Sequence, residues 1–356
     1  MVVFGAGASY DLDRRVLPGS QGGAPEAARL PLAADLFDSR FETIVSRYAA
    51  CQALMPRLRD AKADVEVQLE SFSADVAQHP YRLRQLSAVR YYIRDVILRA
   101  QASWLNYHPD GVTNYVELLD AIEWRRKSEP VALVTFNYDT LLELACQSVL
   151  QRPLDSIDAY VGDDRMRIFK LHGSTAWYQE LQYFGRKVSD FKDDLARDLW
   201  LIEHTGPNLE ATGAYGLYGS EVDNSHRIED YGATRFKGAA VSIPFATKTA
   251  GSFNCPVQHI RMLIGLMPYV THLLVIGWRG REAHFHKLWR DATGMSGPNL
   301  NRRLIKTMVV DRTTESSSGV LETLNEEMGV GDGNVSSVGG GFSGFVQSEG
   351  LATFLG

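Results

Sequence analysis

The sequence predicts an α/β fold, specifically a Rossmann-like doubly wound parallel sheet with a helical insertion. Short apolar runs, each the length of one buried strand, recur along the chain and end abruptly in polar or glycine residues. Segments with apolar residues three and four positions apart follow these runs, which is the pattern of helices packed on a sheet. Because ligands bind at the carboxyl ends of strands in such folds, the residues after each run are the candidate site.

Composition limits the classes of function. The chain has 356 residues and a formal charge of -6, which argues against a dedicated nucleic-acid-binding surface. Its three cysteines are too few for a structural zinc site built from four cysteines, and they make a disulfide framework unexpected, as in a reducing cytoplasm. We find no signal-peptide pattern and no apolar run of membrane-spanning length.

The first predicted strand covers residues 1–4 and is followed at once by small residues. In this position small residues let backbone amides approach a pyrophosphate, although tight turns also use glycine for steric reasons. The residues concerned are Gly5, Ala6, Gly7, Ala8 and Ser9. Residues 17–31 then form a long loop rich in Gly, Pro and Ala, for which a cofactor lid and a solvated connector both remain open.

The helical pattern of residues 32–126 predicts an insertion between the first strand and the second. We therefore expect a catalytic domain made of residues 1–31 and 127–328, interrupted by a helical subdomain at 32–126. Beyond residue 328 the composition shifts to Gly and Ser, which predicts a mobile tail or a loosely packed last strand at 329–356.

The second predicted strand, residues 131–134, leads into Thr135, Asn137 and Asp139, and a helical pattern starts at Leu141. Asn137 and Asp139 therefore lie where such folds place their chemistry. The structural alternative is that Asp139 caps the following helix and Asn137 starts the turn.

Three further strand ends carry candidate residues. His172 and Gly173 follow the strand at 167–171, and His172 is either a general base or a histidine satisfied by a backbone bond. The strand at 273–276 ends in residues that include Gly277 and Arg279. The strand at 307–310 ends in Asp311, which either holds ribose hydroxyls or caps the next turn.

Taken together, Gly-Ala-Gly-Ala-Ser, Asn-Tyr-Asp, Leu-His-Gly, Gly-Trp-Arg and a terminal Asp, in this order on buried strands, resemble the sirtuin-like NAD-consuming family. The resemblance runs from Gly5 to Asp311. The chain departs from sirtuin deacylases in three ways. It lacks their four-cysteine zinc module, and Gly277-Trp278-Arg279 stands where they have Gly-Thr-Ser or Gly-Tyr-Ser. Their arginine-bearing loop after the glycine motif is also not matched closely, although Arg14 and Arg15 lie near it. The chain is thus similar to the branch of bacterial antiphage effectors that hydrolyse NAD.

The resemblance implies a role for each residue. Residues 5–9 would cradle the NAD pyrophosphate, and Asn137 would position the nicotinamide ribose or an attacking water. Asp139 would contact the nicotinamide side of the pocket, and His172 would be the general base near the ribose hydroxyls. Gly277 and its neighbours would face the adenosine half, Asp311 the adenine ribose, and the charge of Arg279 would meet phosphate.

The function implied is an NAD glycohydrolase of the cytoplasm that releases nicotinamide and ADP-ribose and depletes NAD during antiphage defence. NAD would be its substrate, and no zinc is expected. The family also implies a homo-oligomer and a partner such as a HerA-type ATPase or a short Argonaute, without direct nucleic-acid or membrane binding. An NAD-dependent deacylase, an ADP-ribosyl transferase and a non-catalytic NAD sensor remain alternatives, and cyclisation competes with hydrolysis.

Overall fold

A six-stranded, all-parallel sheet forms the centre of the protein, in the order β3-β2-β1-β7-β8-β9. Its strands are β1 (Val2–Phe4), β2 (Val131–Thr135), β3 (Met166–Lys170), β7 (His272–Ile276), β8 (Lys306–Val310) and β9 (Asn334–Val338). The computed structural model describes residues 1–13, 28–126, 128–184, 187–206, 209–219, 233–245, 253–294, 304–330 and 334–356. The inner strands are almost entirely buried, as expected for a sheet covered on both faces.

Numbered by their appearance in this sheet, the strands follow the order 3-2-1-4-5-6, which is the order of a Rossmann fold. The predicted fold class is therefore confirmed. The chain reverses its direction across the sheet between β1 and β7, and the ligand crevice of such folds lies at this point.

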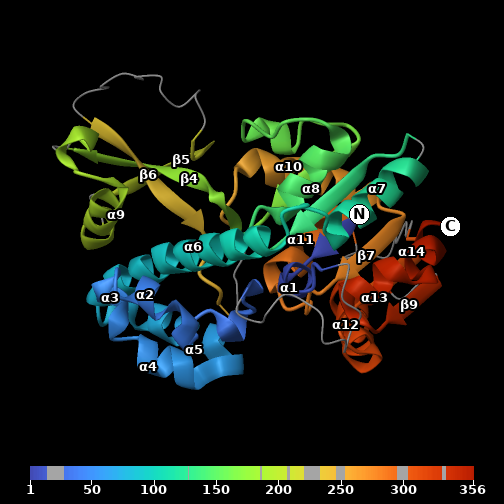
Figure 1. Ribbon diagram of the computed structural model, residues 1–356, viewed down its shortest axis with the longest axis horizontal. Helices are drawn as coiled ribbons and strands as arrows, with labels where there is room; N and C mark the ends of the chain where they lie inside the picture. The colour runs from blue at the N-terminus through green and yellow to red at the C-terminus, as the bar shows by residue number, and fades with distance from the viewer. Residues whose placement is uncertain are drawn as a thin grey trace.

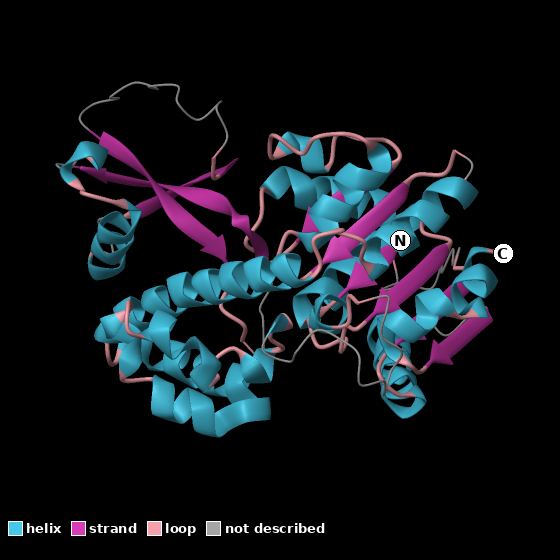
Figure 2. Ribbon diagram, in the orientation of Figure 1, coloured by secondary structure: helices cyan, strands magenta, loops and turns pink. Residues whose placement is uncertain are grey.

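Two groups of helices cover the sheet (Figures 1 and 2). One group consists of α1 (Ala6–Tyr10), α7 (Asn114–Arg125), α8 (Leu141–Leu150), α13 (Gly341–Gln347) and α14 (Glu349–Leu355). The other consists of α10 (Val257–Leu266), the short helix η9 (Met267–Tyr269), α11 (Ala283–Thr293) and α12 (Thr314–Met328). Right-handed crossovers place the two groups on opposite faces of the sheet.

A second sheet, which the sequence did not predict, projects from the first. Its three antiparallel strands lie in the order β5-β4-β6 (Figure 2). They are β4 (Gly173–Phe184), β5 (Glu210–Leu217) and β6 (Ala233–Val241), with the short helix η7 (Val188–Asp190) and helix α9 (Asp194–Glu203) between them. Because β4 begins directly after His172, this sheet starts at the edge of the candidate site.

The helical block precedes β2. Its longer helices are α2 (Glu42–Val45), α3 (Ala49–Gln52), α4 (Met55–Ala61), α5 (Val65–Ala74) and α6 (Tyr81–Tyr107). Short helical turns lie between them: η2 (Ala33–Asp35), η3 (Ser39–Phe41), η4 (Lys62–Asp64) and η5 (Asp75–Ala77). One further turn, η6 (Asp158–Tyr160), lies between α8 and β3.

Two hydrophobic cores divide the described residues differently from the expected boundaries. The larger core includes the parallel sheet, the end of α6 and the buried side of α7. The smaller core joins the rest of the helical block to α9 and β6. Helix α6 contributes Val89 to the smaller core and Trp104 to the larger, and Figure 1 shows it running from one to the other.

Residues 334–356 are part of the fold. β9 pairs in parallel with β8, and Phe342, Phe345 and Phe354 are buried in the larger core. Of the two expectations for residues 329–356, the last strand is the one observed, although two helices follow it. Residues 14–27, which make up most of the expected loop at 17–31, lie outside the described part of the chain.

None of the helices in the described part of the chain is long and apolar enough to cross a membrane.

We predict that Gly277→Ala destabilises the fold strongly, because Gly277 has φ +59° and an added Cβ would lie 2.3 Å from the Ala8 nitrogen. The positive φ alone costs about 1 kcal/mol or more in a residue other than glycine, and the contact adds to that cost. Gly294→Ala is the matched control, since Gly294 has φ +71° with open space around it. Urea denaturation should show the larger loss for Gly277→Ala, and equal losses would contradict this account.

Candidate functional site

The loop after β1 packs directly against the loop after β7. The Gly7 nitrogen donates a hydrogen bond to the Gly277 oxygen at 3.0 Å, and a Cβ on Gly5 would lie 2.5 Å from the same oxygen. Glycine is therefore needed here so that the two loops can touch. The Gly5 and Ala8 amides also bond within the protein, to the oxygens of Ile276 and Gly5, and Ala6 lies exposed at the start of α1.

Asn137 ties the end of β2 to this glycine loop. Its Nδ2 atom lies 2.8 Å from the Gly5 oxygen, 2.9 Å from Ser9 Oγ and 3.3 Å from the hydroxyl of Tyr115. Its backbone nitrogen donates to Thr135 Oγ1 at 3.1 Å, so Thr135 holds the turn that carries Asn137. The predicted residues at the ends of β1 and β2 thus meet in one hydrogen-bonded group.

The partners of Asn137 fix which way its carboxamide faces. The Gly5 carbonyl can only accept, so the atom facing it is the nitrogen. Both Nδ2 protons are then directed toward the β1 loop. No described residue donates a hydrogen bond to Oδ1, and Asn137 keeps 8% of its surface exposed. Oδ1 therefore keeps its capacity to accept a hydrogen bond with respect to the described residues.

His172 is buried among aromatic rings at the same edge of the sheet. Its ring lies 4.9 Å from that of Phe136 and stacks on His284 at 5.5 Å with an interplanar angle of 23°. Phe136 in turn stacks on Trp278 at 5.0 Å. Trp278 follows β7 and Phe136 follows β2, so these contacts place His172 beside the residues that follow those two strands.

Asp139 lies next to a buried ion pair between Lys170 and Glu143, which the sequence did not predict. Its Oδ1 atom accepts a hydrogen bond from the Leu141 nitrogen at 3.1 Å, so Asp139 bonds the first amide of α8, although Thr140 is the N-cap residue. Lys170 Nζ donates to the Asp139 carbonyl oxygen and lies 2.9 Å from Glu143 Oε1. Burial raises the pKa of Glu143, and the charge of Lys170 opposes this rise.

The remaining predicted residues lie along the same edge of the sheet. Gly173 has φ +85°, and an added Cβ would lie 1.9 Å from the Ala240 oxygen, so it serves the turn into β4. Arg279 is exposed beyond the end of β7. Asp311 Oδ1 accepts a hydrogen bond from the Arg312 nitrogen at 2.7 Å, which is the turn-capping alternative.

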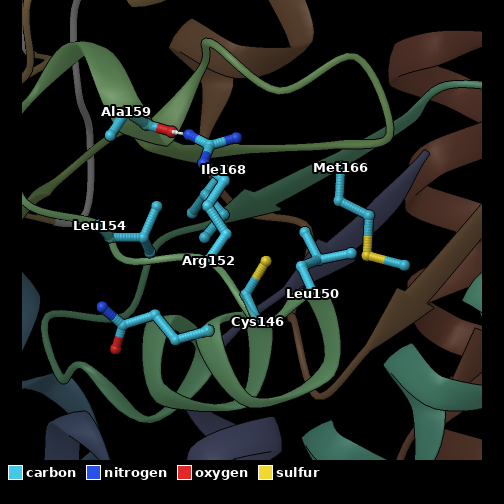
Figure 3. A pocket seen from close by; sticks show the side chains of 8 residues that line it. Cys146, Leu150, Arg152, Leu154, Ala159, Met166 and Ile168 are labelled. Atoms are coloured by element: carbon cyan, nitrogen blue, oxygen red, sulfur yellow. Dashed lines mark hydrogen bonds between the residues drawn. The ribbon is translucent and has the colours of Figure 1, made fainter.

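Two cavities lie elsewhere in the described part of the protein. One, lined by Cys146, Arg152, Met166 and others, has a volume of about 10 Å³, which is room for about one water molecule (Figure 3). Figure 3 also shows Arg152 bonded to the Ala159 oxygen across it. The other is an open groove of about 590 Å³ on the helical block, lined by Arg47, Asp95, Arg99 and neighbours.

Among the residues that the structure describes, no group of three or more His, Cys, Asp or Glu side chains is placed to hold a metal ion. Cys51, Cys146 and Cys255 are buried thiols.

Sequence reasoning missed Tyr115, Lys170 and Glu143. Tyr115 lies within the block assigned to a separate helical subdomain, and no local pattern relates it to Asn137. Lys170 and Glu143 are 27 positions apart and meet because β3 lies beside β2, whose following helix carries Glu143. A lysine inside an apolar strand pattern was the one available signal.

We predict that Lys170→Met destabilises the protein by about 3–5 kcal/mol at pH 8, because it leaves a buried carboxylate without its partner. Without Lys170 the folded-state pKa of Glu143 rises further above its unfolded value of about 4.3. A group whose pKa is raised in the folded state stabilises the fold at low pH, and this contribution disappears as the pH rises. The loss of stability caused by Lys170→Met should therefore be smaller at pH 5 than at pH 8.

Urea denaturation at both pH values measures this difference. Lys287→Met is the control, since the Lys287–Asp291 pair has both side chains 55% exposed, and its removal should cost less than about 1 kcal/mol at either pH. A Lys170→Met loss that is equal at pH 5 and pH 8 would contradict the assigned pairing.

No protein-family model matches the chain, and no curated protein sequence matches it significantly.

Proposed function

We propose that the protein is an NAD glycohydrolase that cleaves NAD to nicotinamide and ADP-ribose. One observation carries the proposal: Asn137 is fixed beside the glycine loop at the switch point of a Rossmann-like sheet, with Oδ1 available to a ligand. Dinucleotides bind at this point in folds of this topology. Asn137 and His172 then lie at one edge, close to where a ribose would be held.

The proposed chemistry matches these groups. The bond from ribose to the positively charged nicotinamide is already activated, and its cleavage passes through a state with positive charge on the sugar. Asn137 Oδ1, an acceptor that stays neutral, would orient the ribose or the attacking water. His172 would take up the proton of that water as the new bond to ribose forms, while nicotinamide leaves with the bonding electrons.

The residues proposed to bind the pyrophosphate differ from those that the glycine motif predicts. The amides of Gly5, Gly7 and Ala8 are bonded within the protein, so they are not free to bind phosphate in this arrangement. Ala6, exposed at the start of α1, and the exposed Arg279 are the groups we propose for the phosphates. Asp311 remains our proposal for the adenine ribose.

A second candidate is a sensor that binds NAD without turnover. It is favoured by the burial of the predicted catalytic side chains. Asp139 is bonded to a helix amide, and His172 is only 3% exposed within a cluster of aromatic rings. A deacylase or ADP-ribosyl transferase would use the same pocket on a different acceptor, and dependence of nicotinamide release on an acylated peptide or a target protein would identify it. A cyclic product would identify cyclisation in place of hydrolysis.

An NAD-depleting enzyme harms its own cell unless it is regulated. We therefore propose, on the strength of the resemblance, antiphage defence in the cytoplasm, a homo-oligomer and a controlling partner of the HerA-type ATPase or short Argonaute class. Exposed apolar side chains gather on α10 and η9 and support self-association: Val257 at 61%, Ile264 at 37% and Tyr269 at 68% exposed.

We predict that nicotinamide release from NAD by the purified protein is lost, by about a hundredfold or more, in Asn137→Ala and His172→Ala. His259→Ala is the control, because His259 is an equally buried histidine that contacts Ile157 and Trp177 away from the strand ends. It should keep the wild-type rate under conditions where it remains folded.

An NAD titration on the same samples separates the two candidates. Release that depends on both residues supports the hydrolase. Saturable binding of NAD without release supports the sensor, and the absence of both would contradict any dinucleotide function.

Light scattering coupled to size-exclusion chromatography tests the proposed self-association. We predict a mass that is a multiple of 39.6 kDa and a shift toward the single chain in Ile264→Asp/Tyr269→Asp. The double variant Val67→Asp/Leu83→Asp, at exposed positions of α5 and α6, serves as the control, because it adds the same charge to the helical block. A single-chain mass for the wild type would contradict the oligomer.

A further inference from the structure

We propose that Tyr115 is a positioning residue that holds the carboxamide of Asn137 in the orientation that presents Oδ1 to the substrate. This inference rests on the proposed NAD cleavage and adds to it a residue from helix α7, which sequence reasoning placed in a separate subdomain. Tyr115 would act through Asn137 and would not itself contact the reacting atoms.

The Tyr115 hydroxyl, the Ser9 hydroxyl and the Asn137 Nδ2 atom form a triangle of hydrogen-bonded groups. The Tyr115 hydroxyl lies 3.0 Å from Ser9 Oγ and 3.3 Å from Asn137 Nδ2, and Ser9 Oγ lies 2.9 Å from the same nitrogen. α7 supplies Tyr115, α1 supplies Ser9 and the turn after β2 supplies Asn137. The Gly5 carbonyl takes one Nδ2 proton, so the Ser9 and Tyr115 oxygens share the other.

The phenol is suited to this task because its position is fixed. The Tyr115 ring is 1% exposed and packs edge-on against Phe4 at 5.1 Å and Phe342 at 5.5 Å. The preceding residue, Asn114, donates from Nδ2 to the Asp11 oxygen at 2.8 Å and to Ser343 Oγ at 3.0 Å. The start of α7 is therefore clamped between the end of α1 and the C-terminal segment.

The hydroxyl also keeps one protonation state across the working pH range. Burial raises the pKa of Tyr115, with the carboxylate of Asp139 adding to the effect, so the phenol stays neutral. Loss of the hydroxyl should therefore lower the rate without moving the pH dependence of the reaction. That behaviour separates positioning of Asn137 from a role in proton transfer.

Without the Tyr115 hydroxyl, Ser9 becomes the only side chain among the described residues that holds the second Nδ2 proton, and the Ser9 hydroxyl loses the neighbour that orients it. The carboxamide keeps its bonds to the Gly5 carbonyl and to Ser9 but is held less narrowly about its terminal bond, which has a broad energy minimum. A ribose or water bound at Oδ1 would lose alignment in the transition state more than it would lose ground-state affinity. The loss should therefore appear in kcat with little change in KM.

The experiment measures steady-state nicotinamide release by the full chain carrying Tyr115→Phe, Asn137→Ala or both. Tyr115→Phe keeps the ring and its packing and removes one oxygen. We expect kcat to fall about tenfold with KM changed less than about twofold and an unchanged pH profile. Adding Tyr115→Phe to Asn137→Ala should cause no further loss, because the phenol acts only through Asn137.

Tyr92→Phe is the matched control. Tyr92 is also fully buried, and its hydroxyl donates to the Leu36 oxygen at 2.8 Å. It lies in the smaller core, whereas the strands of the parallel sheet lie in the larger one. Tyr92→Phe removes one buried hydrogen bond and Tyr115→Phe removes the two that its hydroxyl makes with Ser9 and Asn137, so the melting temperatures of both variants should fall. Only Tyr115→Phe should lower kcat.

The outcomes are distinguishable. Wild-type cleavage with a kcat loss in Tyr115→Phe that disappears in the Asn137→Ala background supports the inference. Wild-type cleavage with equal effects of Tyr115→Phe and Tyr92→Phe, or with losses that multiply in the double variant, overturns it and leaves the proposed function standing. Absence of NAD cleavage by the wild type overturns both.

Discussion

The contact between the β1 and β7 loops is the constraint on which the rest of the site depends. β1 pairs with β2 on one side and β7 on the other, so it occupies the point where the chain reverses across the sheet. At the end of β1 the backbone of residues 5–7 meets that of Gly277 at distances that exclude any Cβ on Gly5 or Gly277. This contact sets the position of Ser9 and of the Gly5 carbonyl, and both hold Asn137.

A second consequence is that the strand ends satisfy most of their own polar groups. The glycine loop amides, the Asp139 carboxylate and Lys170 all bond within the protein. Such internal satisfaction lowers the cost of burying these groups and keeps the site in one arrangement. It also leaves fewer polar groups available to a ligand. Asn137 Oδ1, Ala6 and Arg279 therefore contribute more to the proposed binding than the glycine motif alone predicts.

The sequence was sufficient for the centre of the parallel sheet because β1, β2 and β7 contain continuous apolar runs, which are typical of strands buried on both faces. The edge strand β9 has the sequence Asn-Val-Ser-Ser-Val and contains no such run. The sequence also brought Gly5, Asn137, His172 and Gly277 to one edge, since parallel strands have their carboxyl ends together. The antiparallel sheet could not be predicted in the same way. β5 is largely exposed, so the strand contains glycine and polar residues and has no apolar run that would distinguish it from a loop.

Tyr115, Lys170 and Glu143 escaped prediction for a related reason. Their roles arise from contacts between segments 22 to 106 positions apart, and a single sequence contains no signal for such contacts. Composition left a mobile tail and a last strand equally open for residues 329–356, and the spaced phenylalanines at 342, 345 and 354, which lie in the core, favour the packed alternative.

The most direct test of the central claim is a crystal structure of the protein with ADP-ribose, the product that the proposed reaction releases. The account predicts that the ligand lies across the carboxyl ends of β1 and β7, with a ribose hydroxyl within hydrogen-bond distance of Asn137 Oδ1 and a phosphate near Ala6 or Arg279. A ligand bound in the groove of the helical block, or at the strand ends with no contact to Asn137, would contradict it.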